Sequence, residues 1–213
     1  MTAAVFSIQP EQVVIAMDTL AMAGDTGKPF FFTTKFYILP HLQGVMFATG
    51  IGDLASKWFS QLERYLARDI NHLDNFVTPA LRDLGNEFGL SEKLTTTVYH
   101  VGYSEQESRY VGFAYRSTDS FASERLEYGL RVKPPVEVQP PENFPDDFVA
   151  IMKKQKQMDD EKPMSERVYI GGEIHLLLMQ EGSMEVRTVH RFDEYNGLYL
   201  EMCEQLSNSP TEI

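Results

Sequence analysis

The chain lacks the features that mark a secreted or membrane-spanning protein. It has one cysteine, Cys203, among 213 residues, so no disulfide can form within the chain. It contains no run of about 18 apolar residues and does not open with a basic segment followed by an apolar one. We therefore expect a cytoplasmic protein that does not insert into a membrane.

Positive charge is also scarce. The 31 acidic side chains exceed the 19 basic ones, which leaves a formal net charge of -12 that repels phosphate groups. Nucleic acids and anionic membranes are therefore excluded as expected partners. Hydrophobic residues make up 43% of the chain, enough to bury a core, and the length favours a single domain over residues 1–213.

The first half of the chain predicts strands followed by helices. Short alternating runs indicate four strands, at 3–8, 13–19, 35–39 and 44–49. A helix should follow with Asp53 as its N-cap, because apolar residues then recur every four positions, at Leu54, Trp58, Leu62 and Leu66. A second helix is expected over residues 74–88, with an apolar stripe of Phe76, Ala80, Leu84 and Phe88 and with Pro79 inside it.

The second half returns to strands. We expect three of them, at 95–101, 111–116 and 124–132, then an irregular proline-rich loop at 133–145 and a charged helix at 146–160. Two further strands, at 173–179 and 184–190, precede a closing helix at 198–206. Strand blocks that bracket helix blocks predict an α+β fold, a four-layer αββα sandwich of two antiparallel sheets.

Thr2 directly follows the initiator methionine. Removal of Met1 would place a free amine and a hydroxyl on one residue, so that the amine could accept the hydroxyl proton during nucleophilic attack. Retention of Met1 would turn the amine into an amide, which is not a base at neutral pH. A threonine at the second position is common, and taken alone it indicates nothing.

Two further segments could support such a nucleophile. Asp18 ends the second strand and Lys35 opens the third, so a carboxylate and an ammonium could meet near the start of the first strand. The alternative is a salt bridge at a sheet edge. Thr49 and Gly50 begin a strand-to-helix turn whose backbone N–H groups could bind an oxyanion, although any tight turn there needs the same glycines.

These segments together resemble a known family. The start of the chain, with Met1-Thr2, VVIAMDTLAMAG, TKFYILP and GVMFATGIGD, is similar to the opening of proteasome β subunits and their bacterial relative HslV, and YIGGEIHLLLMQEG resembles the family's C-terminal glycine pair and strand. The resemblance implies an N-terminal nucleophile (Ntn) hydrolase that needs no cofactor and no metal and cleaves peptide or amide bonds. It implies a nucleophile, two charged partners and an oxyanion hole, namely Thr2, Asp18 with Lys35, and Thr49 with Gly50. It also implies a narrow apolar substrate pocket lined by Ala21, Thr33, Tyr37, Phe47 and Ile51, of which the last three could instead pack the sheets.

The sequence departs from the family at two supporting positions. Arg167 and Ile170 stand where the family places an aspartate and a serine that support the threonine amine. We therefore keep two hypotheses: a threonine-type hydrolase, and a non-catalytic structural or regulatory ring subunit. The resemblance implies homo-oligomeric rings for either. A further polar group, His190, Asp193 and Glu194, is better explained as a strand end than as a metal site.

Overall fold

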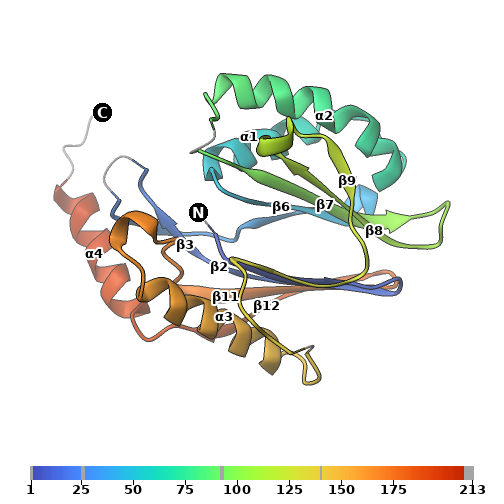
Figure 1. The fold of residues 1–213 in the computed structure, drawn as a ribbon. Helices are drawn as coiled ribbons and strands as arrows, with labels where there is room; N and C mark the ends of the chain where they lie inside the picture. The colour runs from blue at the N-terminus through green and yellow to red at the C-terminus, as the bar shows by residue number, and fades with distance from the viewer. Residues whose placement is uncertain (1, 25–26, 92–93, 140, 209–213) are drawn as a thin grey trace.

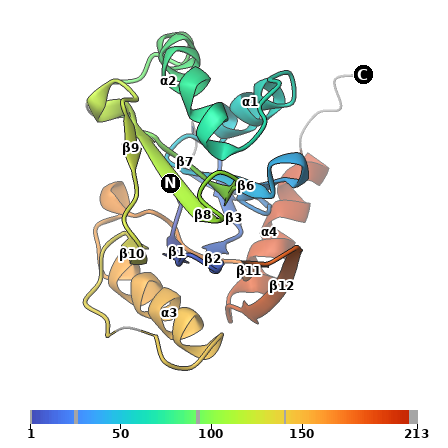
Figure 2. The same ribbon diagram turned by 90° about the vertical axis from the view of Figure 1, so that its right-hand side faces the viewer.

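Two stacked antiparallel sheets lie between two layers of helices (Figure 1). The structure is a computed structural model that describes residues 2–24, 27–91, 94–139 and 141–208. Each large sheet has five strands, and helices cover the outer face of both sheets (Figures 1 and 2). The predicted αββα sandwich is confirmed.

The first sheet carries the start of the chain. Its strand order is β10-β1-β2-β11-β12. The central strand β2 is buried from Val13 to Asp18, as its consecutive apolar residues predict for a strand covered on both faces. The strands are β1 (Ala4–Ile8), β2 (Gln12–Asp18), β10 (Gly129–Lys133), β11 (Glu173–Gln180) and β12 (Ser183–Arg191).

The second sheet has the strand order β5-β6-β7-β8-β9, and a separate hairpin, β3-β4, lies beside the sandwich. The single strand predicted over 124–132 is wrong. The chain leaves the second sheet after β9 and joins the first as β10, and Gly129 at the start of β10 has a φ of 124° that favours glycine. The strands are β3 (Leu20–Met22), β4 (Pro29–Phe32), β5 (Phe36–Leu39), β6 (Gly44–Thr49), β7 (Thr97–Ser104), β8 (Arg109–Arg116) and β9 (Ser123–Arg125).

Four α-helices form the outer layers, α1 and α2 over the second sheet and α3 and α4 on the side of the first (Figures 1 and 2). Within the described ranges, none of the helices has the length and apolar character needed to cross a membrane. The helices are α1 (Gly52–Leu62), α2 (Ile70–Glu87), α3 (Asp146–Asp160) and α4 (Tyr195–Asn208), with short 3₁₀ turns at Pro40–Leu42, Ser117–Asp119 and Met164–Glu166.

The helix predictions need corrections at the start and end of α1 and at the start and buried stripe of α2. Ile51, not Asp53, occupies the N-cap of α1, and Leu66 is 93% exposed beyond the end of that helix. Helix α2 starts before residue 74, because the Asp69 carboxylate accepts the His72 N–H at 2.9 Å and caps it there. Pro79 lies inside α2 without ending it. The buried stripe of α2 is Ile70, Leu73, Val77, Leu81 and Leu84.

The layer between the two sheets fixes the position of the chain's start. Ala4, Phe6 and Ile8 point into it from β1, and the Phe6 ring packs edge-on against Phe47 with ring centroids 5.0 Å apart. Ala3 packs on the opposite face, against α3. Thr2 lies two residues before Ala4, the first residue of β1, so it lies at the N-terminal end of this strand.

Candidate functional site

A buried ion pair lies beside the start of the chain. The Lys35 Nζ is 2.9 Å from both carboxylate oxygens of Asp18, whose side chain is fully buried. The same carboxylate accepts the Ala3 N–H at 3.0 Å and the Gly171 N–H at 3.4 Å. Asp18, the last residue of β2, therefore contacts the residue before β1 and the segments that precede β5 and β11.

This carboxylate brings Lys35 close to Thr2. The Ala3 nitrogen and the Lys35 Nζ each lie about 3 Å from Asp18 Oδ1, so they are at most about 6 Å apart. The Ala3 nitrogen belongs to the peptide that joins Thr2 to Ala3. The structure thus places a buried cation near the predicted nucleophile, and Thr2 itself is partly exposed.

The turn between β6 and α1 requires glycine. Gly50 has a φ of 119°, and a Cβ there would collide with the Thr95 carbonyl oxygen and the Thr96 side chain. The Ile51 N–H donates to Thr96 Oγ1 at 3.1 Å, which fixes the turn further. Thr49 is 5% exposed, and its hydroxyl has no hydrogen-bond partner among the described residues. A buried hydroxyl of this kind is favourable only if water or a ligand satisfies it.

The five residues predicted to line a substrate pocket come from several elements of the fold. Phe47 is fully buried between the sheets, opposite Phe36 of β5. Tyr37, the next residue of β5, faces the other side of the sheet. Tyr37 stacks on Phe59 of α1 at 4.8 Å, and its hydroxyl hydrogen-bonds Ser56 Oγ at 2.9 Å.

The other pocket residues also have packing or backbone roles. Ile51 packs against the core under α1 and α2. Ala21 pairs with Phe31 in the β3-β4 hairpin, and the Thr33 N–H donates to the Thr19 carbonyl oxygen at 2.8 Å. Tyr37 and Ile51 thus contact the core beneath α1 and α2, and Phe47 contacts the core between the sheets.

The two residues that depart from the family pattern have partners of their own at the end of α3 and in the core beneath it. Arg167 donates from Nε to the Lys162 carbonyl oxygen at 2.9 Å and also binds the Asp160 carbonyl oxygen, so it lies at the end of α3. Ile170 is 2% exposed in the core beneath α3.

Sequence patterns missed two basic residues on the inter-sheet face. The pairing of β10, β1, β2 and β11 aligns Lys133, Ala4, Met17 and His175 in one row across the first sheet. Lys133 Nζ is 2.9 Å from Thr97 Oγ1, and burial, followed by the charge of Arg116, lowers the pKa of Lys133. The sequence assigned Lys133 to the start of a loop, and only the strand register shows where it lies.

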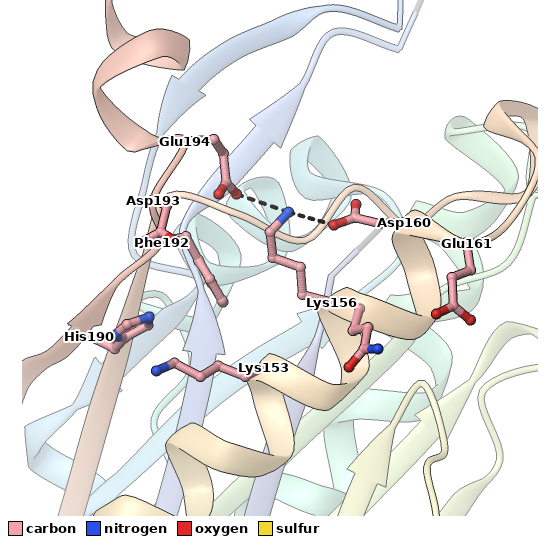
Figure 3. A pocket seen from close by; sticks show the side chains of 9 residues that line it. Lys153, Lys156, Asp160, Glu161, His190, Phe192, Asp193 and Glu194 are labelled. Atoms are coloured by element: carbon pink, nitrogen blue, oxygen red, sulfur yellow. Dashed lines mark ion pairs between the residues drawn. The ribbon is translucent and has the colours of Figure 1, made fainter.

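A separate surface pocket lies between α3 and the end of β12 (Figure 3). Lys156 bridges Asp160 at 3.1 Å and Glu194 at 2.9 Å. Burial lowers the pKa of Lys156, but the two carboxylates outweigh it and the net shift is upward. The pKa of His190 is lowered by burial and then by Lys153. Within the described ranges, no three His, Cys, Asp or Glu side chains are placed to hold a metal.

Comparison with known proteins bears on the fold. The sequence matches no protein-family model and no curated protein. The structure is similar to that of an Anbu (Gly-1) mutant from Hyphomicrobium sp. strain MC1, with a TM-score of 0.63 and 15% identity over 100% of this chain and 99% of that chain. The fold is proteasome-like.

This comparison corrects the family expected from the sequence. The structural similarity is to Anbu at 15% identity and no family model matches, so the short matching segments were too little to assign the chain to proteasome β subunits or HslV. At 15% identity the similarity shows the fold alone. The chemistry has to be argued from this chain's own side chains.

Proposed function

We propose that the protein hydrolyses peptide or amide bonds with Thr2 as its nucleophile after Met1 is removed. The observation that carries this proposal is the buried Asp18–Lys35 pair, because Asp18 also holds the N–H of Ala3, the residue that follows Thr2. Burying two charges costs free energy that a purely structural contact could avoid with apolar residues. A cation fixed beside an N-terminal amine instead has a catalytic use.

Each part of this site has a defined role in the proposed reaction. The Thr2 amine accepts the proton of its own hydroxyl as Oγ1 attacks the carbonyl carbon. Lys35 lowers the pKa of that amine by repulsion between positive charges, and Asp18 holds Lys35 in place. Backbone N–H groups at Thr49 and Gly50 stabilise the oxyanion. The C–N bond then breaks, the leaving amine takes the proton, and water hydrolyses the ester left on Thr2.

A non-catalytic subunit with the same fold is the second candidate. Its supporting observation is that Arg167, which donates to backbone carbonyl oxygens at the end of α3, and Ile170, which packs in the core beneath α3, stand where the resemblance implies a supporting aspartate and serine. The two candidates differ in one assay: hydrolysis of unstructured peptides by protein whose intact mass shows loss of Met1. Thr2→Ser should retain activity and Thr2→Ala should abolish it, whereas equal turnover in wild type and Thr2→Ala contradicts the enzyme proposal.

We also propose that copies of the chain associate into rings. Phe30 and Phe31 of β4 are 56% and 45% exposed, and Tyr199 and Leu200 of α4 are 53% and 63% exposed. Helix α4 packs beside this hairpin through Phe32 and Tyr195, whose rings stack at 4.5 Å. Exposed apolar side chains gathered on adjoining elements are typical of subunit contacts. Light scattering should show an oligomer that Phe31→Glu dissociates, and a monomeric wild type would contradict the proposal.

A further inference from the structure

A hydroxyl, an imidazole and a carboxylate form a hydrogen-bonded series that starts at Thr34, the residue before Lys35. Thr34 Oγ1 is 2.9 Å from His175 Nδ1, and His175 Nε2 is 3.3 Å from Glu173 Oε2. Arg191 donates to the other oxygen of Glu173 from Nε at 2.9 Å and from Nη2 at 2.6 Å. His175 and Glu173 lie two residues apart on β11, and Thr34, just before β5, is brought to them by the packing of the two segments.

The hydrogen bonds fix which way the proton can move. Burial raises the pKa of Glu173, but Arg191 and then His175 outweigh this and keep the pKa below its usual value. An ionised carboxylate only accepts hydrogen bonds, so the His175 Nε2–H donates to Glu173 Oε2. The lone pair of Nδ1 then accepts the Thr34 hydroxyl. His175 is therefore oriented as a base toward Thr34.

The three groups are partly withdrawn from solvent but remain reachable. The side chains of His175 and Glu173 are 19% and 16% exposed, and Thr34 is half-buried. A hydroxyl that is hydrogen-bonded to a base, with the base oriented by a third group, is the arrangement that activates nucleophiles on unrelated folds. This arrangement needs no free N-terminus, so it is complete whether or not Met1 is removed.

We propose that Thr34, His175 and Glu173 form a second nucleophilic centre, separate from Thr2, that accepts acyl groups from carboxylic esters. Thr34 Oγ1 attacks the ester carbonyl carbon while its proton passes to His175 Nδ1. The bond to the leaving alkoxide breaks, and the alkoxide takes that proton from Nδ1. Water then hydrolyses the acyl-threonine with His175 again as the base. Esters are the expected class because an alkoxide leaves more readily than an amine.

The test uses the full chain with two probes, a fluorophosphonate and p-nitrophenyl acetate. We expect the fluorophosphonate adduct to map to the peptide that contains Thr34, and we expect Thr34→Val to remove it. Loss of the base in His175→Gln should slow labelling and acetate release by roughly 100-fold or more. Thr188→Val is the matched control, because Thr188 is the exposed strand partner of His175 and should leave both rates unchanged.

Circular dichroism checks that each variant folds. If His175→Gln does not fold, Glu173→Gln replaces it in the test, because it removes the carboxylate that orients His175. Labelling of Thr34 should persist in Thr2→Ala, which separates this centre from the one in the proposed function. No adduct on Thr34 in the wild type, or equal rates with and without the His175 imidazole, overturns the proposal. An adduct found on Thr2 alone overturns it as well and leaves the proposed function intact.

Discussion

Acid should destabilise this fold through one buried histidine. His100 of β7 is 1% exposed, and its Nε2 accepts the Trp58 Nε1–H at 2.9 Å. The ring stacks against Trp58, and Nδ1 has no hydrogen-bond partner among the described residues. Protonation would put a second N–H where Trp58 now donates, with no carboxylate hydrogen-bonded to the ring. Burial accordingly lowers the pKa of His100 from 6.5 to about 3.

The size and sign of the effect follow from the two pKa values. Below pH 6.5 the unfolded chain binds a proton that the folded chain excludes, so the free energy of unfolding decreases as the pH falls. The loss should be about 2 kcal/mol at pH 5 and about 4 kcal/mol at pH 3, with a limit of about 5 kcal/mol at lower pH, because each pKa unit corresponds to about 1.4 kcal/mol.

The assay is urea unfolding of wild type and His100→Gln at pH 7 and pH 5. The variant loses stability at pH 7, because it disturbs a packed site, but the part of the pH dependence that His100 contributes should vanish. His41→Gln, at an exposed position, is the control and should keep the wild-type dependence. An identical change in unfolding free energy between the two pH values for wild type and His100→Gln would refute the reasoning.

Two other substitutions test the elements that hold the site. Gly50→Ala should destabilise the fold by more than about 1 kcal/mol, because the φ of Gly50 is positive and a Cβ there meets the Thr95 carbonyl oxygen. Gly52→Ala is the control and should be neutral or stabilising, because Gly52 has open space around it at the start of α1. Equal melting temperatures for the two variants would contradict this prediction. Asp18→Asn leaves the Lys35 ammonium without its buried carboxylate partner and should lower the free energy of unfolding by about 3–5 kcal/mol. Glu87→Gln, in an exposed ion pair, should lower it by about 0–1 kcal/mol. Chemical unfolding measures both values, and similar losses would contradict the stabilising role assigned to the Asp18–Lys35 pair.

The sequence predicts the layers of this fold better than its connections. Helix α3 starts and ends where expected, because its charged face and its Phe148, Ile151 and Met152 side follow a helical period. The β3-β4 hairpin was missed, since its strands are short and Phe30 and Phe31 are exposed, so no alternation marks them. The crossing from β9 to β10 was also missed, because apolar alternation does not say which sheet a strand joins.

For the site, too, the sequence predicts a local contact better than the arrangement of residues from distant strands. The meeting of Asp18 and Lys35 was expected because both lie at strand ends, and the structure places them in contact. Two residues of the predicted substrate pocket, Tyr37 and Phe47, pack in different layers, because neighbouring residues of β5 and β6 face opposite sides of the sheet. The positions of Lys133 and His175 depend on register between strands far apart in the sequence, which no local pattern carries.

The central claim is that a free Thr2 amine, assisted by the buried Lys35, makes the Thr2 hydroxyl nucleophilic. The most direct measurement is labelling by a threonine-directed electrophile, mapped by mass spectrometry on protein whose intact mass shows that Met1 has been removed. The account predicts one adduct per chain on Thr2, formed at least about 100-fold more slowly in Lys35→Met. Failure of trimmed wild-type protein to form the Thr2 adduct, or an equal rate in Lys35→Met, would contradict it.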